Sequence, residues 1–305
     1  MRQRDWHSAR TSLDELLTKL PRDGEAHLKL ATVYGELDSV HQMLLTLERA
    51  RNLSPRFVEP ANLIAERFWF KNFNQGLKHL ERQQYDEATA SFRRAVQIAP
   101  DNRHSLARYA EALQQGARYE EAERIYTRLL ANDPTDLTVK AGLAEIYFAQ
   151  KRFEESIEMC DQILASKPFD LQALKRRAYA LLEQQAYDEA EIDFQLLVSI
   201  HPTADLLTDL GRLYMQTRQY EKAIDRFIEA LGLNPKRAEL YRDLGEANWR
   251  LGNYREMARW YQLLVEDLPN DLQGWKNLAL AYEALGQAQL LDLARTRIHA
   301  LTGTN

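Results

Sequence analysis

Proline recurs along this chain at a nearly constant interval, and this interval limits the fold more than any other feature. With Pro60 left out, the prolines stand at positions 21, 55, 100, 134, 168, 202, 235 and 269. Apart from one longer interval between Pro55 and Pro100, their spacing is about 34 residues, the period of a repeat made of two helices. Proline ends a helix because it lacks an amide hydrogen and drives its predecessor out of the helical region. The spacing therefore predicts an all-α chain of helix pairs.

Small and bulky residues keep the same register when each repeat is numbered so that its proline is position 32. Position 8 is always alanine or glycine, and position 24 is mostly bulky. A small residue opposite a bulky one lets two antiparallel helices approach closely. The residues at position 8 are Ala31, Gly76, Ala110, Ala144, Ala178, Gly211, Gly245 and Ala279, and those at position 24 include Leu47, Phe92, Tyr126, Cys160, Phe194, Phe227 and Tyr261. Polar residues beside the prolines, such as Asp133 and Asp271, are turn formers and candidate N-caps for the next helix.

This pattern resembles the tetratricopeptide repeat family. The segment from Leu207 to Pro235 carries the resemblance most clearly, through Leu207, Leu210, Gly211, Tyr214, Tyr220, Ala223, Phe227, Ala230 and Pro235. The resemblance covers nearly the whole chain and implies a right-handed superhelical solenoid of antiparallel helix pairs, in a single domain over residues 1–305. The register gives whole repeats at 24–57, 69–102, 103–136, 137–170, 171–203, 204–237, 238–271 and 272–305.

The two ends of the chain depart from the pattern. Residues 1–23 match only the second helix of a repeat, through Trp6, Leu13 and Pro21, so one apolar face lacks its usual partner helix. We expect either that the natural chain extends further upstream or that this face is covered otherwise, for example in a homo-oligomer formed through the uncapped N-terminal helix. The last repeat carries Arg295 at position 24, and this charge predicts a terminal helix that faces water.

An insertion at 58–68 explains the one long proline spacing. Its length corresponds to about three helical turns, so the insertion predicts a first helix extended by three turns, over roughly residues 60–82 with Pro60 at its start. The extended helix carries four aromatic residues, Phe68, Trp69, Phe70 and Phe73. One interpretation is that the rings fill the space against Leu44 and Leu47 of the preceding helix. The other is that Phe70 and Phe73 face the inner surface and anchor a partner.

Catalytic and metal-binding motifs are absent from the sequence. There is no glycine-rich phosphate loop and no His-Glu-x-x-His pair. The single cysteine, Cys160, occupies a bulky core position and is expected to be a buried apolar residue that does not act as a nucleophile. The sequence therefore predicts a protein that is not an enzyme and needs no cofactor or metal.

Charge and hydropathy exclude further classes of partner. The net charge of −5 gives no electrostatic reason to bind nucleic acid. No apolar run approaches the length of about 18 residues that a membrane-spanning helix needs, so we expect no membrane insertion by this segment. Read as it stands, the sequence favours the cytoplasm, whereas an upstream signal or anchor would favour the periplasm.

The resemblance also implies where a partner would bind, which is the inner face formed by positions 2, 5, 6, 9, 12 and 13 of each first helix. An aromatic or methionine side chain recurs there once per repeat, with charged neighbours of both signs. The candidate partner-binding residues are Phe70, Phe73, Arg108, Phe148, Lys175, Arg176, Tyr179, Asp209, Arg212, Met215, Arg242, Trp249, Lys276 and Asn277. Among them Tyr179, Met215 and Trp249 are predicted to form an apolar stripe, and Arg176, Arg212 and Arg242 to set the polarity and register of the ligand. A solvated inner face with incidental aromatic residues is the alternative.

The subset of the family that clamps the C-terminal carboxylate of chaperones uses a set of Lys, Asn and Arg over three consecutive repeats. Lys175 stands at the first of these positions, but Tyr179 and Asp209 replace the asparagines, so chaperone-tail binding is not expected. The sequence predicts a non-catalytic scaffold that holds a peptide or protein in its concave groove. The alternative is a binding module of a larger enzyme or cell-envelope export or assembly protein, such as a glycosyltransferase or a polysaccharide-secretion protein.

Overall fold

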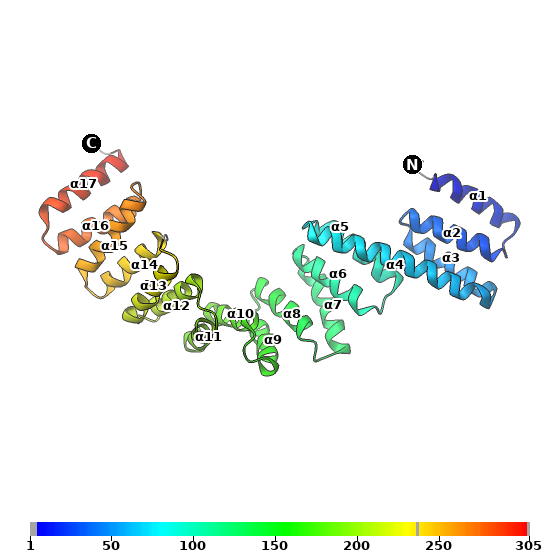
Figure 1. Ribbon diagram of the computed structural model, residues 1–305, viewed down its shortest axis with the longest axis horizontal. Coiled ribbons are helices and arrows are strands. Elements are labelled where there is room, and N and C mark those ends of the chain that lie inside the picture. Colours follow the sequence, from blue (N-terminus) through cyan, green and yellow to red (C-terminus); the bar gives the residue numbers. More distant parts are fainter. Residues whose placement is uncertain (1–4, 236–237, 304–305) are drawn as a thin grey trace. The chain divides into compact units, whose positions relative to one another are not determined.

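A computed structural model describes residues 5–235 and 238–303 of the chain. These residues form seventeen α-helices and one short 3-10 helix, and they contain no strand. The chain divides into two compact units, Met1–Gln150 and Lys151–Asn305, and each is described by itself. Within each unit, a helix lies beside the next one along the chain (Figure 1). The all-α repeat solenoid expected from the sequence is confirmed, whereas one continuous domain stays a prediction.

The helices of the first unit begin with α1, which packs on α2. Their bounds are α1 Trp6–Lys19, α2 Gly24–Glu36, α3 Val40–Leu53, η1 Pro55–Phe57, α4 Val58–Glu81, α5 Tyr85–Ile98, α6 Arg103–Gln115, α7 Tyr119–Asn132 and α8 Leu137–Ala149. The helices of the second unit are α9 Phe153–Ser166, α10 Leu171–Glu183, α11 Tyr187–Ile200, α12 Ala204–Gln216, α13 Tyr220–Leu233, α14 Ala238–Arg250, α15 Tyr254–Asp267, α16 Leu272–Ala284 and α17 Ala288–Thr302.

Most first helices begin at a polar residue shortly after the proline. The side chain at this position accepts hydrogen bonds from backbone amides of the first turn, which have no partner within the helix. Asp271, expected to be an N-cap, accepts from the amides of Gln273 and Gly274 at 3.1 Å each. Asp133 stabilises the turn instead, because its carboxylate accepts from the amide and the hydroxyl of Thr135. The N-cap residues of this kind are Asp23, Asn102, Asp136, Asp170, Thr203 and Asp271.

The turn between the two helices of each repeat contains one residue with a positive φ angle. In every whole repeat this residue is at position 15, and in two repeats it is a glycine, Gly252 or Gly286. The other six are not glycine, although the left-handed region disfavours side chains. They are Asp38, Gln83, Ala117, Lys151, Gln185 and Arg218, with φ angles between 55° and 61°. In most repeats the next residue closes the turn, because its amide donates a hydrogen bond to a carbonyl five residues earlier, as from Ser39 to Tyr34 and from Arg118 to Leu113.

Small residues at position 8 and bulky residues at position 24 meet in the core, as the register predicts. Phe92, Phe194 and Phe227 are fully buried, and so is Cys160. A Cβ atom added to Gly211 would lie 2.4 Å from Cε1 of Phe227. The ring of Phe227 therefore occupies the space that a larger residue at position 8 would need.

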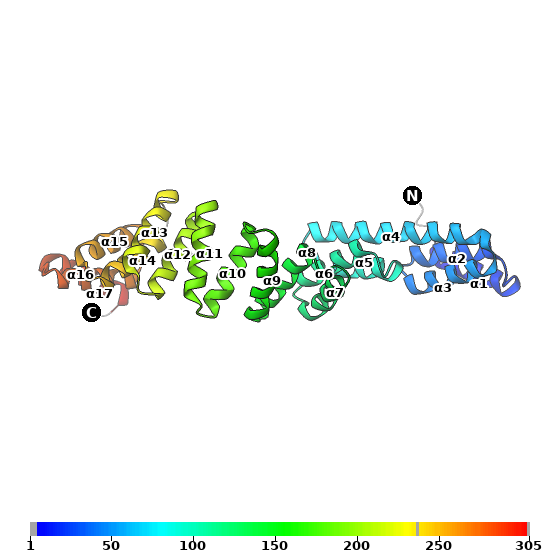
Figure 2. The same cartoon turned by 90° about the horizontal axis from the view of Figure 1, so that it is seen from below.

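The long helix expected from the insertion is α4, which has 24 residues, whereas the other α-helices have 13 to 15. Figure 2 shows it running past α2 and α3 and then along α5. It begins at Val58 and not at Pro60, because the 3-10 turn Pro55–Phe57 leads directly into it. Pro60 is the third residue, where proline is tolerated because amides of the first turn lack helical acceptors. Phe68 is fully buried against Met43 and Leu47, so the core interpretation is correct for this ring.

The two terminal helices are less buried than the others. No residue of α1 is fully buried, and Trp6 and Leu13 are half-buried where α1 lies on α2. In α17 only Ala294 is fully buried. Arg295 is exposed and lies 3.4 Å from Glu283, which confirms that this position faces water.

Candidate functional site

The first helices of the second unit carry most of the predicted partner-binding residues. Tyr179 and Met215 are half-buried on α10 and α12, and Trp249 on α14 is 38% exposed. The helices α12 and α14 contact each other directly, although they belong to successive repeats. The register thus places Met215 and Trp249 on a shared surface of adjacent first helices.

Polar groups link α10, α12 and α14 each to the next first helix or its N-cap. The hydroxyl of Tyr179 donates a hydrogen bond to Asp209. Nε of Arg212 donates to Oδ2 of Asp243 at 3.2 Å, and Nη2 of Arg242 donates to Oδ2 of the N-cap Asp271 at 2.5 Å. Three successive repeat junctions are therefore bridged by a donor on one helix and a carboxylate on the next. Arg212 and Arg242, two of the three arginines predicted to guide a ligand, are therefore engaged within the protein.

Burial changes the proton affinity of two groups in these links. It raises the pKa of the Asp243 carboxyl, and Arg212 opposes this effect through its charge and hydrogen bond. Burial, together with the hydrogen bond to Asp209, also raises the pKa of the Tyr179 hydroxyl. The ring of Tyr179 packs edge-on against Phe194, with ring centroids 5.4 Å apart. Tyr179 and Asp243 are thus partly structural residues, and changes at either position are expected to affect folding.

A hollow of 510 Å³ lies between α12 and α14 on this surface. Met215 provides its apolar wall, and carboxylates from Asp243 and Glu246 face cations from both helices. Arg212, Arg218 and Arg250 are the cations, and Gln216 and Tyr220 complete the lining. The arrangement offers apolar contact and hydrogen-bonding groups of both charges within one small volume.

Trp249 adjoins this hollow on α14, next to the lining residue Arg250. The guanidinium carbon of Arg250 lies 4.5 Å from the centre of the indole ring, and its Nη2 lies 3.2 Å from Oε1 of Glu246. A cation held over the ring limits its rotation. Trp249 is therefore an aromatic side chain that is both accessible and oriented, which is the character of a binding anchor.

The remaining predicted residues of the second unit are spread along the same helices. Lys175 is exposed, with Nζ 5.9 Å from the ring centre of Tyr179. Arg176 is half-buried near Cys160, and its charge partly opposes the rise in the pKa of Cys160 that burial causes. Lys276 is exposed on α16, and Oδ1 of Asn277 accepts a hydrogen bond from Gln273 at 2.9 Å. None of these four lines the hollow between α12 and α14.

The predicted residues of the first unit do not gather in one place. Arg108 is exposed and pairs with Glu111 on its own helix at 2.6 Å. Phe73 is half-buried, stacks on Trp69 at 5.2 Å and lies edge-on to Phe92. It therefore contributes to the core as well as to the surface. Phe70 is 49% exposed. Phe148 on α8 is half-buried.

Six residues of the hollow are not among the named candidates. Gln216, Asp243, Glu246 and Arg250 stand at inner-face positions of the register, whereas Arg218 and Tyr220 lie outside those positions. Arg218 is the left-handed residue of the turn after α12, and Tyr220 is the first residue of α13. The start of the second helix is aromatic in six repeats, at Tyr85, Tyr119, Phe153, Tyr187, Tyr220 and Tyr254. This recurrence of an aromatic residue is the signal by which the sequence could have indicated Tyr220. The turn between the two helices follows position 13, the last inner-face position, so its residues lie at the end of the inner face.

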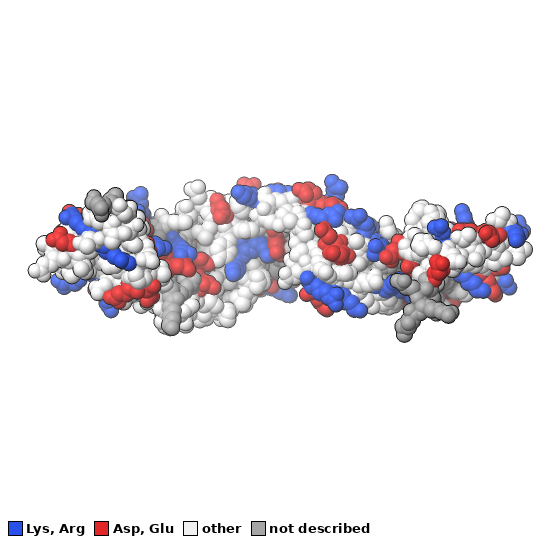
Figure 3. All heavy atoms as spheres, turned by 90° about the horizontal axis from the view of Figure 1, so that it is seen from above, with Lys and Arg blue, Asp and Glu red and all other residues white. Residues whose placement is uncertain are grey.

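Three features of the described residues bear on the chemistry of this surface. No group of three or more His, Cys, Asp or Glu side chains among residues 5–235 and 238–303 is suited to a metal ion. None of the helices in the described ranges has both the length and the apolar character needed to cross a bilayer. Burial raises the pKa of Cys160 to about 11, so its thiolate is scarce at neutral pH. Lys and Arg side chains lie next to Asp and Glu on the face drawn in Figure 3.

Models of the tetratricopeptide repeat match more than half of the chain. One model matches residues 79–141 and 117–178, and a second matches residues 208–271. Two curated relatives match shorter stretches. The tetratricopeptide repeat-containing protein trd-1 of Caenorhabditis elegans is 30% identical over 78 residues, which are 26% of this chain and 10% of that protein. Anaphase-promoting complex subunit 6 of Arabidopsis thaliana is 28% identical over 108 residues, 33% of this chain and 20% of that protein. The chain thus matches only a small part of each relative.

Solved structures share the fold at low sequence identity. A tetratricopeptide repeat protein from Parabacteroides merdae superposes with a TM-score of 0.54 at 17% identity, over 74% of this chain and 98% of that one. YrrB, described as a repeat protein with an unusual peptide-binding site, has a TM-score of 0.51 at 15% identity, over 59% of this chain and 93% of that one. These likenesses concern the helical repeat architecture.

Proposed function

This chain belongs to the tetratricopeptide repeat family, and on that premise we propose that it is a non-catalytic scaffold that holds a peptide segment of a partner protein. The observation that carries the proposal is the hollow between α12 and α14, with Met215 in its wall and the oriented indole of Trp249 beside it. A peptide that crosses this hollow can place an apolar side chain on Met215 and Trp249. Its backbone and charged groups then meet carboxylates and guanidinium groups.

Mixed charge in the hollow favours specificity over raw affinity. Arg212 and Arg250 are paired with Asp243 and Glu246, so a ligand charge has to compete with an existing partner. Apolar contact with the exposed part of Trp249 does not require an ion pair to break, although Arg250 lies over the ring. We therefore assign most of the binding free energy to the aromatic anchor and its apolar neighbour, and we assign ligand orientation to the ion pairs.

The test uses peptides selected from a random 12-residue phage-displayed library on the full chain, followed by affinity and melting measurements on variants. Trp249→Ala is expected to weaken the selected peptides by roughly 30-fold, about 2 kcal/mol for loss of an anchor. Because Trp249 is partly exposed, the free energy of unfolding should change by only about 0.5 kcal/mol. Unchanged affinity for Trp249→Ala would place binding elsewhere.

Phe70→Ala is the matched control, since Phe70 is also an exposed aromatic residue of a first helix but lies in the other unit. It should leave the affinity of the same peptides unchanged. Loss of affinity with Phe70→Ala alone would assign the site to α4. Arg212→Ala is a poorer probe, because it also leaves the half-buried carboxylate of Asp243 without its cation.

A second proposal is that the repeats form the binding module of a larger enzyme or cell-envelope export or assembly protein. The matched repeats make up 10% and 20% of the two curated relatives, so such repeats do occur within longer proteins. Sequencing the gene upstream and downstream of this segment tests the proposal. A catalytic domain, a lipoprotein signal or a membrane anchor in the same reading frame would support it.

A further inference from the structure

A second groove lies on the other side of α10 from Tyr179. It is a hollow of 320 Å³ with Ile157 of α9 and Ile192 of α11 on its walls, and Arg177 and Leu181 of α10 on its floor. Residues two apart in an α-helix are about 200° apart around its axis, so Arg177 and Leu181 face away from Lys175 and Tyr179. This groove between the second helices is therefore separate from the site of the proposed function.

An ion-pair network makes the floor of this groove rigid. Arg177 donates from Nε and Nη2 to the two carboxylate oxygens of Asp193 at 2.8 and 2.6 Å, and from Nη1 to Asp161 at 2.5 Å. These contacts join α9, α10 and α11. Asp193 is 1% exposed, and its hydrogen bonds raise the pKa of Arg177. A bidentate contact of this kind fixes both partners, so the groove is formed before any ligand arrives.

Aliphatic surface remains uncovered above this floor. Ile192 is 64% exposed, and Ile157 and Leu181 are half-buried. Single exposed aliphatic residues are ordinary, but three that converge on one hollow form an apolar contact surface. The groove therefore offers a place for an apolar side chain of a partner.

The walls of the groove are acidic. The helices α9 and α11 contain eight carboxylates and no lysine or arginine. Within the lining, the three carboxylates of Asp161, Asp193 and Glu189 face the single guanidinium of Arg177, which leaves a net charge of −2. Glu189 is exposed at the rim. The carboxylates of the two helices are Glu154, Glu155, Glu158, Asp161, Asp188, Glu189, Glu191 and Asp193.

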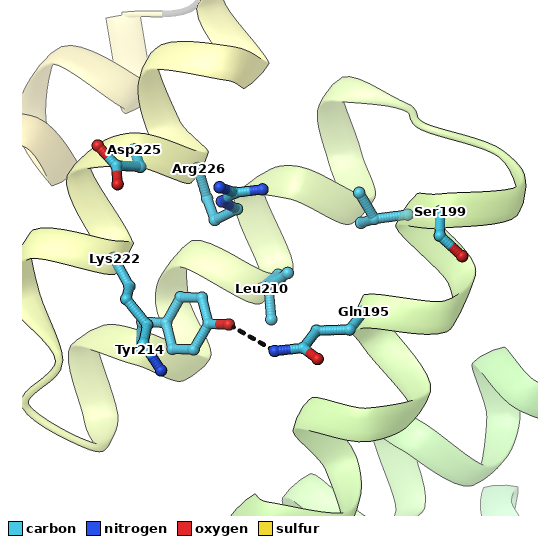
Figure 4. A pocket seen from close by; sticks show the side chains of 8 residues that line it. Gln195, Ser199, Leu210, Tyr214, Lys222, Asp225 and Arg226 are labelled. Carbon is cyan, nitrogen blue, oxygen red and sulfur yellow. Dashed lines mark hydrogen bonds between the residues drawn. The ribbon is translucent and has the colours of Figure 1, made fainter.

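The next groove along the same face has a different lining, although the repeat builds it in the same way. It lies between α11 and α13 over α12, and Figure 4 shows its lining side chains. Lys222, Asp225 and Arg226 stand one repeat after Glu189, Ile192 and Asp193. Gln195 donates to the hydroxyl of Tyr214 at 3.0 Å across this groove (Figure 4). The combination of aliphatic and acidic residues is therefore a property of the α9–α11 groove and not of the repeat.

We propose that the α9–α11 groove binds a basic amphipathic segment of a partner protein. An aliphatic side chain of that segment packs on Ile192 and Leu181, and its lysine or arginine residues lie at the rim near Glu189. We expect a basic ligand because the lining of the groove carries a net negative charge. We expect an aliphatic side chain of the ligand to pack in the groove because Ile192 is exposed there. Because this site lies on the other face of α10, it gives the scaffold a second partner surface.

The test measures binding of a fluorescein-labelled 16-residue peptide of leucine and lysine, with leucines at i, i+3, i+4 and i+7, to the full chain by fluorescence anisotropy. The same peptide with glutamate in place of lysine is the ligand control. We expect the lysine peptide to bind and the glutamate peptide not to bind. Glu189→Lys and Ile192→Ser should each weaken binding at least tenfold, and because both residues are exposed, both variants should retain the parent melting temperature.

Asp188→Lys is the matched control, because it makes the same charge change one residue away, at an exposed position that does not line the groove. It should retain most of the affinity, as should Asp225→Ser in the next groove and Trp249→Ala on the first-helix face. Equal losses for Asp188→Lys and Glu189→Lys would show diffuse attraction and overturn the proposal. Absence of binding, or loss of binding with Trp249→Ala, would also overturn it.

Discussion

The distance between paired helices depends on single residues at position 8. Gly211 lies directly against the ring of Phe227, and Gly76 and Gly245 lie in the same way against Phe92 and Tyr261. In each case a Cβ atom would come within 2.4 to 2.6 Å of the ring. A fully buried ring cannot move without disturbing its own neighbours, so a methyl group at any of these three glycines would overlap the ring.

Gly211→Ala is expected to lower the free energy of unfolding by about 1–3 kcal/mol, because its methyl group overlaps Phe227. Gly232→Ala is the control, since Gly232 lies in helix α13 with no atom within 4 Å of its added Cβ. It should raise the free energy of unfolding by about 0.5–1 kcal/mol through reduced backbone entropy of the unfolded chain. Chemical denaturation followed by circular dichroism measures both. Equal effects in the two variants would contradict the packing argument.

The buried thiol of Cys160 makes stability depend on alkaline pH. Burial raises its pKa from 9.0 to about 11, so the folded state favours the neutral thiol. This contribution is complete below pH 9, the unfolded value, and is lost as pH rises through 11. The difference in unfolding free energy between the parent protein and Cys160→Ala should therefore fall between pH 8 and pH 11, by about 2 kcal/mol at most. A difference that does not change with pH would show that the thiol is not desolvated.

At the scale of the element, the turn at position 15 costs energy in six of the repeats. Ala117 has a φ angle of 57°, whereas Gly252 has 76° at the equivalent position. The left-handed conformation is unfavourable for a residue with a side chain, whereas glycine adopts it without this energetic cost. Both residues are exposed, so side-chain packing does not complicate the comparison.

Ala117→Gly is expected to raise the free energy of unfolding by up to about 1 kcal/mol, because it relieves the backbone strain of the turn. Gly252→Ala should lower it by a similar amount, since no atom lies near its added Cβ and only the φ angle opposes the change. Thermal melting of the two variants and the parent is the measurement. Destabilisation by Ala117→Gly would mean that unfolded-chain entropy outweighs the strain.

At the scale of the whole molecule, the helices of each unit contact mainly their neighbours along the chain. The long helix α4 contacts α2, α3 and α5, and α15 contacts α14 and α16. The stability of such a chain is a sum of local terms and nearest-neighbour interfaces, so it need not unfold as one cooperative unit.

Hydrogen exchange measured by mass spectrometry tests this locality with two reciprocal variants. Gly76→Ala pushes a methyl group against Phe92 and should speed exchange in α4, α5 and α6, while α14 to α17 keep the parent rates. Gly245→Ala pushes against Tyr261 and should speed exchange in α14, α15 and α16 without affecting α2 to α5. Faster exchange along the entire chain in either variant would indicate a single cooperative domain.

The sequence by itself determined the repeat, the positions of most helices and the small and bulky core residues. Proline acts locally, because it ends a helix through its own backbone. Glycine or alanine at position 8 also acts locally, because its small size allows the paired helix to approach. The long helix α4 was also predictable, because an insertion of about three whole turns keeps the helical phase. Only the start of α4 differs from the prediction. The helix begins at Val58 and not at Pro60, because the 3-10 turn Pro55–Phe57 leads directly into it.

Tertiary structure alone decided which surface side chains are available. The register placed Tyr179, Arg212 and Arg242 on the inner face. It did not reveal that their hydrogen bonds are accepted by Asp209, by Asp243 and by Asp271, which lie on the next first helix or at its N-cap. These partners are 29 to 31 residues away in sequence, and they meet only because successive first helices lie side by side. A repeat period fixes the direction in which a side chain leaves its helix. Its hydrogen-bond partner depends on distances across the repeat junction, and those distances arise only when the helices are packed.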